Sequence, residues 1–292
     1  MRKLMVLTFL LTAGVAGCNQ PPEVELTSDE TASNLEVLAI VLPDTDIEVT
    51  AVDTIGLLPD EQVRYTGSCV MNTIAWDGGA GVKRAAYSRV FVADSSVRAI
   101  GRLVGFSGLD LGQVTLNGNP MLKLPHRVPV GRLFGRDSTL VRGVEYLADL
   151  TTTYQPDRQY TWTIPLHLAP SLVVTTETPE ELKVLSPAGG AIVSRARDLH
   201  LRWAGGKGRL SIVVGVFEAL QKKSRPLFEL RAKANTGHAI IPAKLLAQLP
   251  AQRLFVFTFI LSNKKEIVQV APLSGKLFVQ AASIHNSYVE LR

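Results

Sequence analysis

Apolar and polar residues alternate along most of the chain after Asn34, and β-branched residues are frequent in the alternating stretches. A period of two is typical of strands that bury one face. Turn residues such as Asp77-Gly78-Gly79 and Asn117-Gly118 punctuate the pattern. In the first half of the chain it predicts strands over 35–43, 47–52, 63–71, 85–93, 112–118 and 158–165.

The same pattern continues in the second half of the chain. It predicts strands over 182–193, 199–206, 209–219, 226–234, 253–261, 266–273 and 275–291. In Leu199–Trp203, alternate apolar side chains share one face, so Trp203 is predicted to anchor the core, while His200 and Arg202 face outward. We interpret GGKGR at 205–209 as a hairpin turn.

A single helical signal interrupts the strands. In IPAKLLAQLP, at 241–250, Pro242 suits the start of a helix and three leucines share one face. Composition changes at the proline-containing run 165–181, which separates two groups of strands. The sequence therefore predicts an all-β fold with two β-sandwich-like domains in tandem, at 35–170 and 182–292, a linker at 171–181, and one short connecting helix in the second domain.

The N-terminus has the pattern of a signal peptide. Arg2 and Lys3 precede the apolar run 4–16, which is too short to span a bilayer. The run ends in Val-Ala-Gly-Cys at 15–18, which resembles the lipobox of bacterial lipoproteins. That resemblance implies removal of residues 1–17 and acylation of Cys18, which would hold the protein in a membrane. The alternative is an ordinary secretory signal with a chance cysteine near its cleavage site.

Residues 18–34 are predicted to be a flexible tether, because they carry four carboxylates, no basic residue and few large apolar groups. Asn19 follows the cysteine where the inner-membrane retention signal of the lipoprotein family is typically aspartate, which favours the outer membrane. The expected location is therefore extracytoplasmic and lipid-anchored.

The second domain resembles fibronectin type III and immunoglobulin-like modules of bacterial extracytoplasmic proteins. The resemblance rests on SPAGG at 186–190 and LHLRWAGG at 199–206. The order of lipobox, acidic tether, β-domain and this module is similar to that of uncharacterised bacterial envelope lipoproteins. It implies a sandwich fold and a binding or structural role, but no activity.

Catalytic and metal-binding motifs are missing from the sequence, so no enzyme activity, cofactor or metal is predicted. The five histidines lie 33 to 47 residues apart. After Cys18 is acylated, Cys69 has no disulfide partner, and we interpret it as a buried apolar residue rather than a reactive thiol. The alternative function is an envelope hydrolase, such as a carbohydrate-active or peptidase-like enzyme, whose active site assembles from distant residues.

Charge divides the chain sharply. Residues 19–181 contain 12 Lys and Arg against 21 Asp and Glu, whereas residues 182–292 contain 17 against 5. The candidate binding residues are basic side chains around the first hairpins of the second domain, namely Arg195, Arg197, Arg202, Lys222, Lys223, Arg225, Arg231 and Lys233. We expect Arg202 to stand beside Arg231 on a neighbouring strand, where like charges repel unless an anion relieves them.

Three interpretations of this basic face stay open. It is a solvated surface, or it docks the acidic first domain, or it binds an anionic partner such as phospholipid, lipopolysaccharide, a cell-wall polymer or another envelope protein. Nucleic acid is not an expected partner, because the protein is predicted to be outside the cytoplasm and aromatic residues do not alternate with the basic ones.

Overall fold

The computed structural model describes residues 35–39, 67–94, 107–133, 136–166, 169–206, 208–218, 223–232, 234–249, 253–263, 266–270 and 275–292. The predicted signal peptide, lipobox and tether lie outside the described residues, as does the predicted strand at 47–52.

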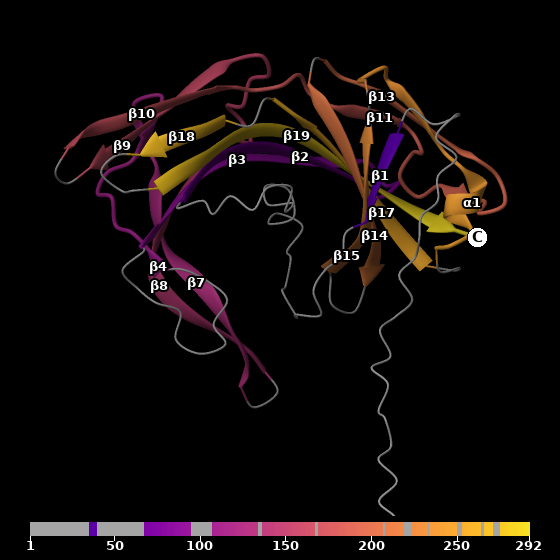
Figure 1. Cartoon of the computed structure of the whole chain (residues 1–292), viewed down its shortest axis with the longest axis horizontal. Helices are drawn as coiled ribbons and strands as arrows, with labels where there is room; N and C mark the ends of the chain where they lie inside the picture. The colour runs from indigo at the N-terminus through magenta and orange to yellow at the C-terminus, as the bar shows by residue number, and fades with distance from the viewer. Residues whose placement is uncertain are drawn as a thin grey trace, which may run out of the picture.

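Most strands belong to one strongly curved sheet that gives the molecule the shape of an arch (Figure 1). Its 12 strands include β12 (Ile192–Val193) and β18 (Glu266–Val270), which pair with β19 beside the main path. The main path runs through β1 (Leu35–Ala39), β15 (Lys223–Ala232), β14 (Arg209–Glu218), β17 (Arg253–Ser262), β19 (Gly275–Leu291), β2 (Gly67–Asp77), β3 (Val82–Asp94), β4 (Ser107–Gly108), β8 (Arg136–Asp149) and β7 (Leu122–Leu133).

Two smaller sheets cover the outer side of the arch (Figure 1). One contains β10 (Ala169–Glu177), β9 (Gln159–Leu166), β5 (Thr115–Leu116) and β6 (Asn119–Pro120). The other contains β11 (Lys183–Ser186), β13 (Leu199–Ala204) and β16 (His238–Ile241), beside the helix α1 (Ala243–Leu246). The predicted all-β, sandwich-like fold with one short helix is confirmed.

The first core lies between the three-stranded sheet and one end of the arch. Along β13 the side chains are alternately buried and exposed, so Leu199, Leu201 and Trp203 point inward. The ring of Trp203 packs 6.2 Å from that of Phe259, and its indole N–H donates to Asn235 Oδ1 at 2.7 Å. The prediction that Trp203 anchors the core is confirmed.

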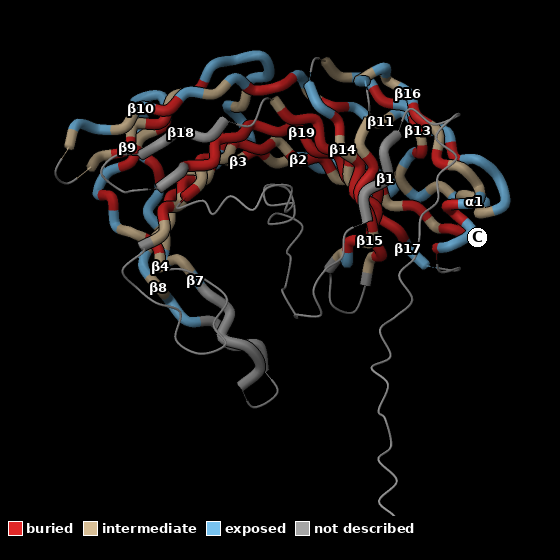
Figure 2. The backbone as a smooth tube through the Cα atoms, in the orientation of Figure 1, coloured by how far each residue is buried: buried red, intermediate tan, exposed pale blue. Residues whose placement is uncertain are grey.

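The second core lies between the four-stranded sheet and the other end of the arch. Trp162 is fully buried there and donates its indole N–H to Ser88 Oγ at 2.8 Å. Cys69 belongs to the same core with no exposed surface, and burial raises the pKa of its thiol far above the ordinary value. Cys69 is thus a buried apolar residue, as predicted. Figure 2 shows the buried positions gathered where the layers face each other.

Strand β19 connects the two sandwich-like units. Its first part contributes Leu277 and Val279 to the second core, and its last part contributes Val289 and Leu291 to the first core. It pairs in antiparallel fashion with β17 on one side and in parallel with β2 on the other. The two units therefore share a continuous sheet and are not independent domains joined by a linker.

The structure differs from the predicted domain boundaries in two places. β1 lies in the segment assigned to the first domain, yet it pairs with β15 of the second unit. The segment 171–181 was predicted as a linker, but its residues up to Glu177 form part of β10, which pairs with β9. Proline-containing polar sequence here marks a peripheral strand, since β10 ends the path of its small sheet.

The turn predicted at 205–209 is also different in the structure. β13 pairs with β11 and β16, whereas β14 pairs with β15 and β17. The glycine-rich segment therefore crosses from the small sheet to the large one and does not close a hairpin. At Gly205 φ is +138° and an added Cβ would stand 3.1 Å from the carbonyl oxygen of Glu181, so the backbone of this crossing favours glycine.

Candidate functional site on the three-stranded sheet

The structure separates the basic residues that the sequence grouped together. Cys18, Lys222 and Lys233 lie outside the described residues, and of Lys223 only the backbone in β15 is described. Arg197 is exposed in the turn before β13, and Arg225 is exposed on β15. Of the described residues, Arg225 lies in the large sheet, whereas Arg197 lies in the turn that leads into the small one.

Arg195 has a structural role. Its Nε donates to the carbonyl oxygen of Leu246 at 3.3 Å, and its guanidinium also bonds the carbonyl oxygen of Ala247. Both carbonyls are at the end of α1, where helix geometry leaves them without an intrahelical partner. Arg195 therefore holds the short helix against the sandwich.

Arg231 is not beside Arg202, and that expectation is wrong. Arg231 lies on β15 of the large sheet, where its Nε is 3.2 Å from Oε1 of the buried Glu229. Arg202 lies on β13, whose neighbours are β11 and β16. The sequence could not show that β13 and β16 belong to the small sheet while β14 and β15, which lie between them in the chain, belong to the large one.

The neighbours of Arg202 are histidines. The register of β13 and β16 places Arg202 of β13 directly opposite His238 of β16. His200, also on β13, lies diagonally across from His238. His200 Nδ1 is 3.5 Å from His238 Nε2, and the two rings are tilted by 31° with centroids 5.7 Å apart. All three side chains are exposed, because the alternate positions of both strands face the first core.

Strand β11 completes this surface on its other side. Arg202 is opposite Ser186, and the exposed Lys183 is opposite Ala204. We call the four basic side chains Lys183, His200, Arg202 and His238 the cationic face. Sequence reasoning missed Lys183 and His238 because neither belongs to a charged run, and the four-residue strand β16 is too short to give a periodic signal.

The cationic face offers hydrogen-bond donors, and Lys183 and Arg202 also bring positive charge. None of Lys183, His200 and Arg202 forms an ion pair with an acidic side chain in the part of the chain that the structure describes. A guanidinium group presents several N–H donors in a planar fork that matches carboxylate and phosphate oxygens. The chemistry available here is the binding of an anion.

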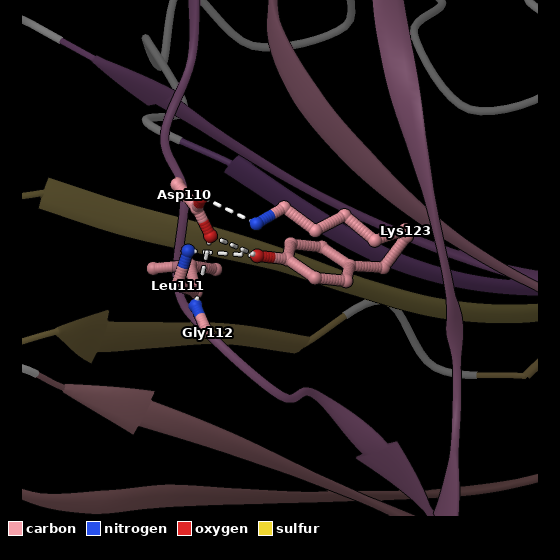
Figure 3. Close-up of polar contacts among 5 residues, drawn as sticks. Asp110, Leu111, Gly112 and Lys123 are labelled. Atoms are coloured by element: carbon pink, nitrogen blue, oxygen red, sulfur yellow. Dashed lines mark hydrogen bonds and ion pairs between the residues drawn. The ribbon is translucent and has the colours of Figure 1, made fainter.

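A second polar cluster joins β7, β8 and the segment before β5 (Figure 3). Asp110 forms an ion pair with Lys123 and accepts the Gly112 N–H at 3.0 Å. The hydroxyl of Tyr146 donates to Asp110 Oδ1 at 3.2 Å and accepts the Leu111 N–H at 2.7 Å. The cluster clamps residues 110–112 onto the curved sheet.

The electrostatics of this cluster suit a clamp rather than an acid–base pair. The hydrogen bond from Lys123, helped by the Gly112 N–H, lowers the pKa of Asp110. Burial raises the pKa of Tyr146. At neutral pH, Asp110 is therefore ionised and Tyr146 is protonated. A general acid or base works best when its pKa is near the working pH, and neither group meets this condition.

A third cluster lies on the inner side of the arch, on β3, β7 and β8. Glu145 Oε2 is 2.7 Å from Arg89 Nη2 and 3.4 Å from His126 Nδ1, and His126 packs 4.5 Å from the ring of Phe91. Burial opposes ionisation of Glu145, but the hydrogen bond from His126 and the charge of Arg89 outweigh it and lower the pKa of this carboxyl. Glu145 is therefore ionised, and the neighbouring Arg89 balances its negative charge.

Among the described residues, no group of three or more His, Cys, Asp or Glu side chains is arranged to hold a metal ion. None of the helical residues that the structure describes forms a helix long and apolar enough to cross a membrane. No protein-family model matches the chain, and no curated protein is significantly similar to it.

Proposed function

We propose that the chain is an extracytoplasmic lipoprotein, tethered to a membrane through Cys18, that binds an anionic component of the cell envelope through the cationic face. The observation that carries the ligand part is the register of β13 and β16, which sets Arg202 opposite His238 and beside His200. The anchor part rests on the lipobox-like sequence at 15–18.

Two permanent charges and two imidazole rings support an anionic ligand. Arg202 and Lys183 carry the charges, and ring N–H groups of the histidines beside Arg202 can donate to the same phosphate or carboxylate oxygens. Each exposed Lys or Arg near an anionic surface is worth about 1 kcal/mol, and that attraction is screened by salt within about 8 Å at physiological ionic strength. Binding through the cationic face should therefore be measurable at low salt and weak at high salt.

Three classes of envelope component share the required chemistry. Phospholipid head groups, lipopolysaccharide and anionic cell-wall polymers all present phosphate or carboxylate oxygens to a donor-rich surface. The docking interpretation has less support, because the units join through the shared sheet, and Arg84 of the first unit pairs at 2.7 Å with Glu181 of the predicted linker rather than with a residue of the second domain.

The test of the ligand uses residues 18–292 with Cys18→Ser, so that neither an acyl group nor the apolar run 4–16 adds affinity. Purified lipopolysaccharide and vesicles containing anionic phospholipid are titrated in low salt against Arg202→Glu and against Arg253→Glu as the matched control. Arg253 is exposed on β17, away from the cationic face. We expect Arg202→Glu to weaken binding to at least one ligand about tenfold or more. An equal effect of both substitutions would show that only net charge matters.

The test of the anchor is fractionation of cells that produce the chain. The unaltered protein should remain with the membranes and be released by detergent, because two or more acyl chains hold a protein stably. Cys18→Ser should move it to the soluble fraction. Membrane association that survives this substitution would contradict the lipoprotein proposal without bearing on the cationic face.

A further inference from the structure

The hairpin of β7 and β8 extends from one end of the arch as a two-stranded ribbon (Figure 1). β8 pairs with β3 through Tyr146–Asp149 and with β4 at Gly143. From Arg142 back to Arg136, its only partner among the described strands is β7. A two-stranded ribbon is marginally stable in water unless one of its faces is covered.

Apolar side chains on this ribbon face solvent. Leu122 is 63% exposed, Val141 is 50% exposed and Leu140 is 40% exposed. The other large apolar residues that are exposed in the described structure lie one to a strand, on β3, β10, β11, β12 and β17. Leu140 and Val141 are consecutive in β8, so they face opposite sides of the ribbon, whereas Leu122 is opposite Leu147 at its base; both faces of the two-stranded part therefore expose an aliphatic side chain.

Basic side chains accompany the apolar ones. Arg127 is exposed and is the cross-strand partner of Val141, and Arg142 follows Val141 in the chain. Two acidic residues lie nearby: Glu145 is already paired with Arg89 and His126, and Asp137 is the cross-strand partner of Arg132. Among the described side chains at 122–127 and 140–142, the exposed ones are thus apolar or basic, which is the combination that suits the head-group region of an anionic bilayer.

We propose that the β7–β8 hairpin is a membrane-contact arm that lies in the interface of an anionic phospholipid bilayer. Strand addition by another protein is disfavoured, because β7 ends the sheet with Pro125, which has no N–H to donate. A protein partner is also less suited, since binding hot spots favour Trp and Tyr, whereas the exposed anchors here are Leu and Val. The proposal requires neither the lipid on Cys18 nor the cationic face.

A site-specific label tests the contact directly. In residues 18–292 with Cys18→Ser, which lack the apolar run 4–16, Cys69 is fully buried, so a new surface cysteine is the one thiol that reacts. Val141→Cys carries an environment-sensitive dye, and Val173→Cys is the matched control, because Val173 is 60% exposed on β10. Vesicles contain phosphatidylcholine alone or phosphatidylcholine and phosphatidylglycerol in a ratio of about three to one.

We expect a blue shift of the dye at position 141, and not at position 173, when vesicles containing phosphatidylglycerol are added. Arg127→Gln with Arg142→Gln should lower the vesicle partition coefficient at least about tenfold, since each basic residue near an anionic surface contributes roughly fivefold. Leu140→Ser with Val141→Ser should lower it by a similar factor, and thermal unfolding checks that each variant is folded.

Two outcomes overturn the proposal. The first is the same dye response at positions 141 and 173, which would show no preferred contact by the arm. The second is vesicle binding that is lost with Arg202→Glu but kept when the arm is altered, which would place the lipid contact on the cationic face. In the reverse case, where arm variants alone lose vesicle binding, the membrane-contact arm stands and the cationic face must take another ligand or none.

Discussion

Substituting Trp162 by Phe should lower the stability of both cores by the same amount. Trp162 is fully buried in the second core, and its indole N–H is the donor to the buried Ser88 hydroxyl. Phenylalanine leaves that hydroxyl without its partner, which costs about 1–3 kcal/mol. The smaller ring also removes buried atoms, each CH₂-sized group being worth about 0.8 kcal/mol. The total loss is about 2–4 kcal/mol.

The assay reads the effect in the other core. In a background with Trp76→Phe, Trp162→Phe leaves Trp203 as the one remaining indole, and Trp203 lies in the first core against Phe259. Because β19 belongs to both cores, we expect the unfolding transition reported by Trp203 in urea to move to lower denaturant by about 1 M, for a slope of about 2–3 kcal/mol/M.

The reference protein carries only Trp76→Phe and is followed by circular dichroism as well as fluorescence. Ser88→Ala added to Trp162→Phe should recover part of the loss, since removing both partners relieves the unpaired hydroxyl. A Trp203 transition that stays in place, while circular dichroism shows an earlier loss of strand structure, would refute the reasoning. The two units would then unfold independently in spite of the shared strand.

Three further predictions follow from buried or crowded positions. Cys69 should react with a thiol reagent in the Cys18→Ser chain only after unfolding, which is measured by comparing labelling rates with and without denaturant, because burial both shields it and raises its pKa. Burial lowers the pKa of His285 below the ordinary 6.5, so the unfolded chain binds the proton more readily than the folded one. The free energy of unfolding should therefore fall as pH drops through about 6.5. His285→Gln should reduce this pH dependence in unfolding measured from pH 8 to 5. Gly143→Ala should lower the free energy of unfolding by well over 2 kcal/mol, because φ at Gly143 is +76° and the new Cβ would stand 1.8 Å from the carbonyl oxygen of Gly108. Gly112→Ala is the control, with φ +79° and open space around the new Cβ, and should cost only about 1–2 kcal/mol. Equal losses in chemical unfolding would contradict the close approach of β4 and β8.

The fold was largely predictable from alternation, because most strands bury one face and expose the other. Along Leu199–Ala204 every position behaves as the pattern predicts. β7 and β8 were missed, since their sequences contain prolines, glycines and several charges, and the ribbon they form has little core to bury. β16 was missed because a strand of four residues gives too few alternations to count.

The candidate site was predictable in kind but not in membership. Net charge identified a cationic second half, and Arg202 was correctly placed on the outward side of β13. Its neighbours follow from strand order, and strand order is set by packing over long sequence separations rather than by local pattern. Arg195 and Arg231 show what the local pattern does not reveal. Arg195 donates to backbone carbonyl oxygens at the end of a helix, and Arg231 forms an ion pair with a buried glutamate.

The parallel pairing of β2 with β19 has a consequence for how the chain reaches this structure. Gly67 of β2 pairs with Leu277 of β19, so one edge of β2 stays uncovered until β19, the last strand in the chain order, has paired with it. Contacts between residues so distant in sequence slow folding, because the loop entropy is lost before the contact is gained. Until β19 arrives, β2 presents an open edge and neither core has its shared strand. A chain of this design depends on being kept apart from its own copies while it folds.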